Sequence, residues 1–117
     1  MPFLKLNDQP ELELAKGIRA RVVNAESMSV IHVRVEAGAV LPEHSHINEQ
    51  VVNVIEGHLE LTVAGQRYDL IPGTVMVLPP NIPHSGRAIK ESRVIDVFHP
   101  VREDFRGKSF VGYAKEN

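Results

Sequence analysis

The sequence predicts an all-β fold, arranged as one antiparallel sandwich or barrel. Three observations support this prediction: short segments rich in β-branched residues alternate apolar and polar positions, glycine and proline turns separate them, and no helical period appears between them. The longest stretch without glycine or proline, residues 18–37, itself follows a period of two. Evenly spaced short strands of this kind are typical of closed antiparallel folds.

The predicted strands follow one another along the chain, and most of them end at turn residues. Residues 18–24 alternate apolar side chains with two arginines, and residues 28–36 place Ile31, Val33 and Val35 on one face. The remaining predicted strands are residues 51–56, 59–63, 68–71, 75–78 and 94–98. Turns are predicted at Glu56-Gly57, Ala64-Gly65-Gln66 and Pro72-Gly73. Only the acidic ends, around residues 9–16 and 102–105, favour a helical turn.

Length and composition exclude several classes of protein. A chain of 117 residues has room for a single domain, which we expect to span residues 1–117. The net charge of −2 provides no basic field for nucleic acid or an anionic membrane, and no apolar run is long enough to span a bilayer. The N-terminal residues lack the apolar core of a secretion signal, so we expect a cytoplasmic protein. Without cysteine there is no thiolate nucleophile or thiolate metal site.

Three of the six histidines have a spacing that suits a metal site. His44 and His46 are two residues apart, which on a strand sends both imidazoles to one face with about 7 Å between their Cα atoms. Neutral imidazoles that converge in this way suit a divalent transition metal. The His-x-His spacing alone is weak, because it also occurs by chance on solvent faces. A third histidine, His84, follows a proline-rich turn after Gly73.

These residues together resemble the two motifs of the cupin family, G-x5-H-x-H-x(3,4)-E-x6-G and G-x5-P-x-G-x2-H-x3-N. The first motif is matched by Gly38, His44, His46 and Gly57, with Gln50 at the glutamate position. The second is matched by Gly73, Pro79 and His84, with Asn81 at the second glycine and Ala88 at the terminal asparagine. The resemblance implies a single-domain cupin, a double-stranded β-helix or jelly-roll barrel, with its metal-binding motifs within residues 38–88. It also implies one divalent metal bound by His44, His46, Gln50 and His84. Nickel, zinc, iron and manganese all suit such a set.

Glutamine at the glutamate position changes the charge of the site. Three imidazoles and an amide leave a divalent charge uncompensated, which favours an anionic ligand in an open position. The neighbouring Glu49 is the rival ligand, but Gln50 shares its strand face with Val52 and Val54, which form the better barrel lining. A structural alternative also stands, in which the histidines line a pocket without metal.

The other three histidines are expected on the surface or at the rim. His32 lies in mid-strand, His58 follows a turn glycine and His99 precedes a proline.

A second group of candidate residues lies in residues 94–102. Asp96 shares a strand face with Val94 and Phe98, and the opposite face of this strand is also largely apolar. Its carboxylate therefore has hydrophobic neighbours on either face. A buried carboxylate tends to have a raised pKa, which suits a general acid or base. The alternative is a structural ion pair with Arg93, Arg34 or Arg21.

The run from Asp96 to Phe105 is similar to the last strand and tail of one cupin subgroup, the KdgF proteins of pectin degradation. These proteins open the ring of 4,5-unsaturated monouronates to linear 4-deoxy-5-keto uronates. The resemblance implies that Asp96, Phe98 and Arg102 are catalytic and that the substrate is a small anionic sugar acid. We expect Asp96 to shuttle the proton, Phe98 to form an apolar wall, and Arg102 with the metal to hold the carboxylate. Arg87 is either a further anion contact or a surface residue.

Two other functions remain open at this point. A cupin dioxygenase also uses a three-histidine metal site, and a non-catalytic cupin binds a small molecule in its barrel. Several strands have apolar positions on both faces, which suggests a buried outer sheet face, and small cupins usually form dimers. The resemblance therefore implies a homodimer. Residues 107–117 could add an edge strand, cross to a partner or stay loose.

Overall fold

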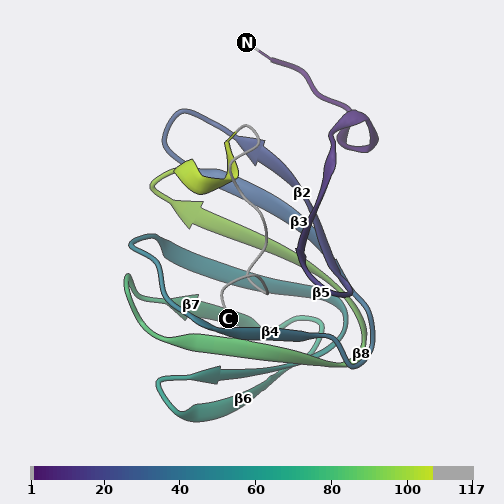
Figure 1. Cartoon of the computed structure of the whole chain (residues 1–117), viewed down its shortest axis with the longest axis vertical. Helices are drawn as coiled ribbons and strands as arrows, with labels where there is room; N and C mark the ends of the chain where they lie inside the picture. The colour runs from purple at the N-terminus through teal and green to yellow at the C-terminus, as the bar shows by residue number, and fades with distance from the viewer. Residues whose placement is uncertain (1, 107–117) are drawn as a thin grey trace.

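The computed structural model describes residues 2–106, in which eight strands form one bent antiparallel sheet (Figure 1). The strands are β1 (Glu11–Ala15), β2 (Ile18–Asn24), β3 (Ser29–Val35), β4 (Val40–His44), β5 (Glu49–Val63), β6 (Gln66–Leu70), β7 (Val75–Leu78) and β8 (His84–His99). Two short 3-10 turns, η1 (Leu6–Asp8) and η2 (Glu103–Phe105), lie near the two ends of this region. The all-β prediction is confirmed. The expectation for residues 107–117 lies outside the described residues.

Two long strands, β5 and β8, bend through the molecule and belong to both layers of the barrel. The first layer of the barrel has the strand order β1-β2-β3-β8-β5-β7, and the second layer has the strand order β4-β8-β5-β6. Figure 1 shows the two layers facing each other, joined at the right of the view where β5 and β8 turn. Their inward side chains form the core, which includes Val33, Leu61 and Leu78. This is the jelly-roll arrangement that the sequence predicted.

The predicted turn at Glu56-Gly57 is wrong, because β5 runs through it as one strand with a bulge. Gly57 has a φ of +93°, and a Cβ there would lie 2.3 Å from the carbonyl oxygen of Glu91 and 2.3 Å from Ser92 Oγ. Glycine is therefore required by close backbone approach as well as by φ. The bulge also shifts the alternation: even-numbered residues from Gln50 to Val54 face inward before it, and odd-numbered residues from Leu59 to Val63 after it.

The N-terminal prediction is also wrong: residues 9–16 contain strand β1 and not a helical turn. Cross-strand pairing explains the difference, because Glu11 lies opposite Arg21 and Glu13 lies opposite Arg19 on β2. Opposite charges at alternating positions support a strand, whereas the acidic residues alone suggested the start of a helix. The helical turn expected at residues 102–105 is confirmed as η2.

Several local predictions from turn chemistry are confirmed. The β5–β6 hairpin turns at Ala64 and Gly65, which have φ values of 48° and 84°. Asn81, in the position of the second motif glycine, adopts a φ of 66°. The strand predicted at residues 94–98 is the last part of the longer β8.

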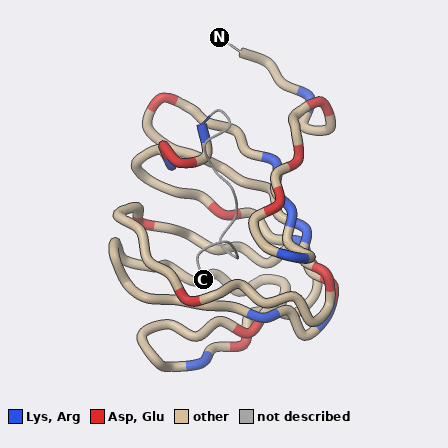
Figure 2. Tube along the Cα trace, viewed as in Figure 1, with Lys and Arg blue, Asp and Glu red and all other residues tan. Residues whose placement is uncertain are grey.

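Charged residues are spread along the strands and loops (Figure 2), and most of them are exposed or half-buried. Among residues 2–106, the buried carboxylate and guanidinium groups are those of Asp96 and Arg102. Both are residues that the sequence singled out. No helix within residues 2–106 has the length and hydrophobicity needed to cross a membrane.

Candidate metal centre

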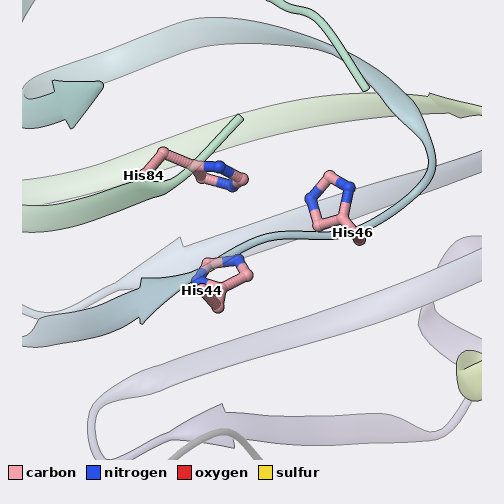
Figure 3. Close-up of side chains that lie close together, drawn as sticks. All are labelled: His44, His46 and His84. Atoms are coloured by element: carbon pink, nitrogen blue, oxygen red, sulfur yellow. The ribbon is translucent and has the colours of Figure 1, made fainter. Parts of the chain in front are cut away.

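The imidazoles of three histidines converge on one point (Figure 3). His44 ends β4, His84 begins β8 directly opposite it, and His46 lies in the loop that follows β4. Their ring centroids lie 4.3 to 5.7 Å apart, and one nitrogen from each ring lies within 4.8 Å of the others. The predicted convergence of these three side chains is therefore present in the structure.

Hydrogen bonds to the backbone fix which nitrogen of each ring carries its hydrogen. The Nδ1 atoms of His44, His46 and His84 lie 2.8, 3.1 and 2.9 Å from the carbonyl oxygens of Pro42, Asn48 and Ile82. A carbonyl oxygen only accepts, so each Nδ1 is the donor and each neutral ring keeps its Nε2 lone pair. Buried histidine ligands of metals are oriented in this way.

Burial keeps these rings neutral. It lowers the pKa of His44 and of His46 to about 4, and it lowers the pKa of His84 as well. The hydrogen bonds to backbone carbonyls oppose this effect, while the positive charge of Arg102 adds to it. At neutral pH the cluster is therefore a set of neutral donors.

Gln50 completes the donor set from the facing layer. Its side chain is buried, and its Oε1 lies 3.1 Å from Nε2 of His46. Since His46 donates from Nδ1, two acceptor atoms face each other at this distance, an arrangement that a cation between them stabilises. Three imidazole nitrogens and one carbonyl oxygen fit a divalent transition metal. Glu49, the rival ligand, is exposed on the outer face of β5.

Asp96 lies beside this donor set in the interior. Its carboxylate is buried, and Oδ1 has no hydrogen-bond partner among the described residues. Burial raises the pKa of Asp96 to about 7, although a hydrogen bond from Gln50 and the charge of Arg102 act in the opposite direction. Gln50 therefore connects the histidines with the carboxylate, its amide oxygen toward His46 and its amide nitrogen toward Asp96.

The structural ion pair considered for Asp96 is not formed. Arg21 and Arg34 pair with Glu11 at 3.5 and 3.0 Å, and Arg93 lies 3.8 Å from Glu56. All three arginines lie on the outer face of the barrel, on the opposite side of the sheet from Asp96.

Phe98 and Arg102 lie next to the histidines. The Phe98 ring meets His46 edge-on at 5.5 Å, and the Arg102 guanidinium lies 4.8 Å from the Phe98 ring and 4.0 Å from the Phe105 ring. Arg102 is buried and already engaged: Nε and Nη2 donate to the two carboxylate oxygens of Asp104. The structure thus brings together the predicted metal and catalytic residues. Arg102 is bonded to Asp104, a partner that the sequence analysis missed.

An internal cavity joins these groups. Most of its lining is apolar and comes from both layers. Its polar lining residues are His44, Gln50, His84, Arg87, Asp96 and Arg102. The Arg87 guanidinium pairs with Glu60 and is more than half exposed, in agreement with the surface alternative. The three remaining histidines lie on the surface or are half-buried, as expected, and His58 contacts Asp69.

Asn48 is a further residue that the sequence did not reveal. It is buried, its backbone oxygen accepts from His46, and its side-chain amide donates to the carbonyl oxygens of Pro100 and Val101 at 2.6 and 3.3 Å. The backbone N–H of Arg102 donates to the buried Ser29 hydroxyl. The hydrogen bonds of Asn48 connect the loop that contains His46 with the segment just before Arg102, and the bond from Arg102 to Ser29 holds that segment against β3.

The sequence of residues 31–98 matches the family model for the cupin domain. The match covers more than half of the chain, so the protein belongs to the cupin family. The three-histidine cluster in a cupin fold supports a metal cofactor.

Comparison with three known proteins shows which cupins this chain resembles. The chain is 28% identical over 102 residues to the pectin degradation protein KdgF of Dickeya dadantii (strain 3937), covering 85% of this chain and 93% of that protein. It is 33% identical over 82 residues to the H2HPP isomerase of Bacillus subtilis, covering 68% of this chain and 34% of that protein. The solved structure of KdgF from Halomonas sp. matches with a TM-score of 0.81 at 27% identity, covering 89% and 97% of the two chains. The protein is a small cupin that resembles KdgF.

Proposed function

We propose that this cupin is a metal-dependent enzyme of pectin or alginate breakdown that opens the ring of 4,5-unsaturated monouronates to linear 4-deoxy-5-keto uronates. The likeness to pectin degradation proteins named KdgF, which extends over nearly the whole chain, supports a role in this process. The observation that carries the proposal is the buried Asp96 carboxyl next to Gln50 and the histidine cluster.

One divalent metal ion would be held by His44, His46, Gln50 and His84. Nickel, zinc, iron or manganese suits these donors. When bound, the ion supplies Lewis acidity that attracts the carboxylate of the substrate and its adjacent oxygens. With Gln50 as the fourth ligand, none of the four protein donors carries a negative charge that would compete with that carboxylate.

Asp96 supplies the proton in the proposed reaction. The substrate is a cyclic enol ether, so a proton is added to C4 while the oxygen of a water molecule bonds to C5 and the water loses a proton. Breaking the bond between C5 and the ring oxygen then opens the hemiketal: the C5 hydroxyl loses its proton and becomes the ketone, and the ring oxygen takes up a proton. C1 then carries two hydroxyl groups and releases a water molecule to leave the aldehyde. With a pKa raised to about 7 by burial, a fraction of Asp96 is protonated at neutral pH and its conjugate base also exists there.

Phe98 and Arg102 position the ring. The Phe98 ring forms an apolar wall beside His46, against which one face of the sugar packs. Arg102 adds a buried positive charge over the Phe98 ring and favours binding of an anion. Because Nε and Nη2 of Arg102 are bonded to Asp104, its contribution here is mainly through charge.

Loss of the conjugated-alkene ultraviolet band of a 4,5-unsaturated monouronate tests the proposal. The metal-loaded wild type should accelerate the loss over spontaneous ring opening, whereas metal-stripped protein, Gln50→Ala and Asp96→Asn should not. Arg93→Ala is the matched control, since its guanidinium lies on the outer face in an exposed pair with Glu56. A wild-type rate equal to the spontaneous rate would remove this substrate, and iron-dependent oxygen consumption in its place would favour the dioxygenase.

A further inference from the structure

Asn48 contacts both functional parts of the site. It lies in the loop between β4 and β5, two residues after His46, and only 4% of its surface is exposed. Its backbone carbonyl oxygen lies 3.1 Å from Nδ1 of His46 and accepts the hydrogen of that ring. Its side-chain nitrogen Nδ2 lies 2.6 Å from the carbonyl oxygen of Pro100 and 3.3 Å from that of Val101. One residue therefore bonds to a proposed metal ligand and to the backbone directly before Arg102.

The two carbonyl oxygens that face Asn48 require a donor with two hydrogens. The amide nitrogen of asparagine carries two N–H groups and serves both acceptors at once. An ionised aspartate of the same size has no hydrogen to donate and would bring its own oxygens against the two carbonyls. Alanine would leave both carbonyls without this donor, at the cost of two hydrogen bonds. The position of Pro100 and Val101 therefore depends on an amide at residue 48.

Arg102 is fixed to two different parts of the barrel. Its own N–H donates to Ser29 Oγ of β3 at 2.9 Å, and the carbonyls of the two residues before it accept from Asn48. The guanidinium lies 4.8 Å from the centre of the Phe98 ring, and that ring meets the His46 ring at 5.5 Å. A displacement of the residues before Arg102 would therefore move its positive charge relative to the cavity and the histidines.

We propose that Asn48 is a positioning residue that couples the candidate metal centre to the anion-binding charge of Arg102. This inference rests on the proposed function, which assigns the histidines to a metal and Arg102 to the substrate carboxylate. Because the backbone and the side chain of Asn48 move together, one residue sets both the orientation of His46 and the place of Arg102. Loss of a contact that orients a metal-ligating histidine typically costs about 10- to 100-fold in metal affinity or activity. Misplacement of a substrate-binding group by about 1 Å has an effect of the same order.

Three variants of the full chain separate this role from a general effect on stability. Asn48→Ala should weaken metal binding about tenfold, measured by competition with a chelator, and raise KM for the unsaturated monouronate about tenfold. The kcat of the metal-loaded variant should stay within about twofold of wild type, since the proton donor is unchanged. Ser29→Ala should raise KM but leave the metal affinity unchanged, because its hydroxyl holds Arg102 without bonding to the histidine loop.

Asn53→Ala is the matched control. The Asn53 amide also donates to a backbone carbonyl, that of Ile95 at 3.2 Å, but it lies on the outer face of β5. This variant should change neither the metal affinity nor KM. Asn48→Asp, which keeps the size of the side chain but has no N–H to donate, should show the same two losses as Asn48→Ala. Thermal unfolding of each variant identifies those that fold.

A double-mutant cycle with Arg102 isolates the coupling. If Asn48 acts on substrate binding through Arg102, the addition of Asn48→Ala to Arg102→Ala should raise KM no further. The same rise in KM in both backgrounds overturns the proposal, as does a metal affinity of Asn48→Ala equal to that of Asn53→Ala. The metal measurement uses no substrate, so its result holds whether or not the wild type opens the ring. A wild type without ring-opening activity would instead refute the proposed function.

Discussion

Arg102 and Asp104 form a two-point ion pair beside the cavity, with Nε 2.9 Å from Oδ1 and Nη2 2.7 Å from Oδ2. The guanidinium is buried between the rings of Phe98 and Phe105, while the carboxylate remains half exposed. A buried cation next to three imidazoles is thus compensated by a carboxylate two residues along the chain. Without that partner, the charge of Arg102 would be costly to bury.

The first prediction concerns the pH dependence of this pair. Burial raises the pKa of Asp104, but its hydrogen bond with Arg102 and the charge of Arg102 outweigh burial and lower the pKa overall. Stability from a lowered carboxyl pKa is present above the unfolded value near 3.8 and is lost as the pH falls through the folded value. Asp104→Asn should therefore cost about 1 kcal/mol at neutral pH, with solvent screening of the exposed carboxylate included.

Urea unfolding at neutral pH and below about pH 3 measures the difference. At the lower pH, the wild type and Asp104→Asn should have the same free energy of unfolding. Glu103→Gln is the control, since that side chain is 77% exposed and pairs with Arg106. An Asp104→Asn deficit of the same size at both pH values would mean that the loss comes from packing and not from charge.

Metal binding should stabilise the folded chain. A ligand present at 100 times its dissociation constant adds about 2.7 kcal/mol, which corresponds to a rise of about 10 °C in Tm for a domain of this size. His84→Ala should abolish the rise, whereas His58→Ala, whose imidazole contacts Asp69 on the outside, should retain it. Thermal unfolding with nickel, zinc, iron or manganese added to stripped protein gives the result. An equal rise in both variants contradicts binding at the histidine cluster.

Gln50→Glu should tighten metal binding by about tenfold or more, because an anionic ligand then offsets part of the divalent charge. The same carboxylate would lie next to the buried Asp96 and raise its pKa further. Competition with a chelator measures the affinity, and the ring-opening rate against pH reports the effect on Asp96. Glu49→Gln changes the neighbouring outward side chain and should leave the affinity unchanged. If Glu49→Gln weakens binding instead, the assignment of the fourth ligand is wrong.

Gly57→Ala should destabilise the barrel by more than about 2 kcal/mol, because the new methyl group meets the backbone of β8 as well as an unfavourable φ. Gly65→Ala is a matched control: its φ of +84° is similar, but a Cβ there has nothing within 4 Å. We expect a cost of about 1 kcal/mol from φ alone in the control. Chemical denaturation of both variants separates the steric contribution from the conformational contribution, and equal losses would show that crowding at the bulge is relieved.

The period of two was enough to place Gln50 inward and Glu49 outward, since each decision depends only on the alternation of one strand. The same argument placed Asp96 next to Phe98 on one face. Asn48 was not found because its role depends on segments that meet only in the folded chain. Asp104 lies two residues from Arg102, but the sequence does not show that the Arg102 guanidinium is buried and needs a partner. The partners of Asn48 are backbone carbonyls about fifty residues away, and backbone groups carry no sequence pattern. The turn assigned at Gly57 failed because a bulge and a tight turn both require glycine.

The bulge in β5 has a consequence for how the protein tolerates change in length. Residues before and after Gly57 face inward with opposite parity, so the insertion or loss of a single residue there would turn one half of β5 over. Gln50 and Val52 would then exchange faces with Glu49 and Val51. A change of one residue in length would thus remove the Gln50 amide from the histidine cluster. It would also put the outward Val51 in the core position of Val52. Libraries and homologues should therefore tolerate substitutions at the outward positions of β5 better than any change in its length.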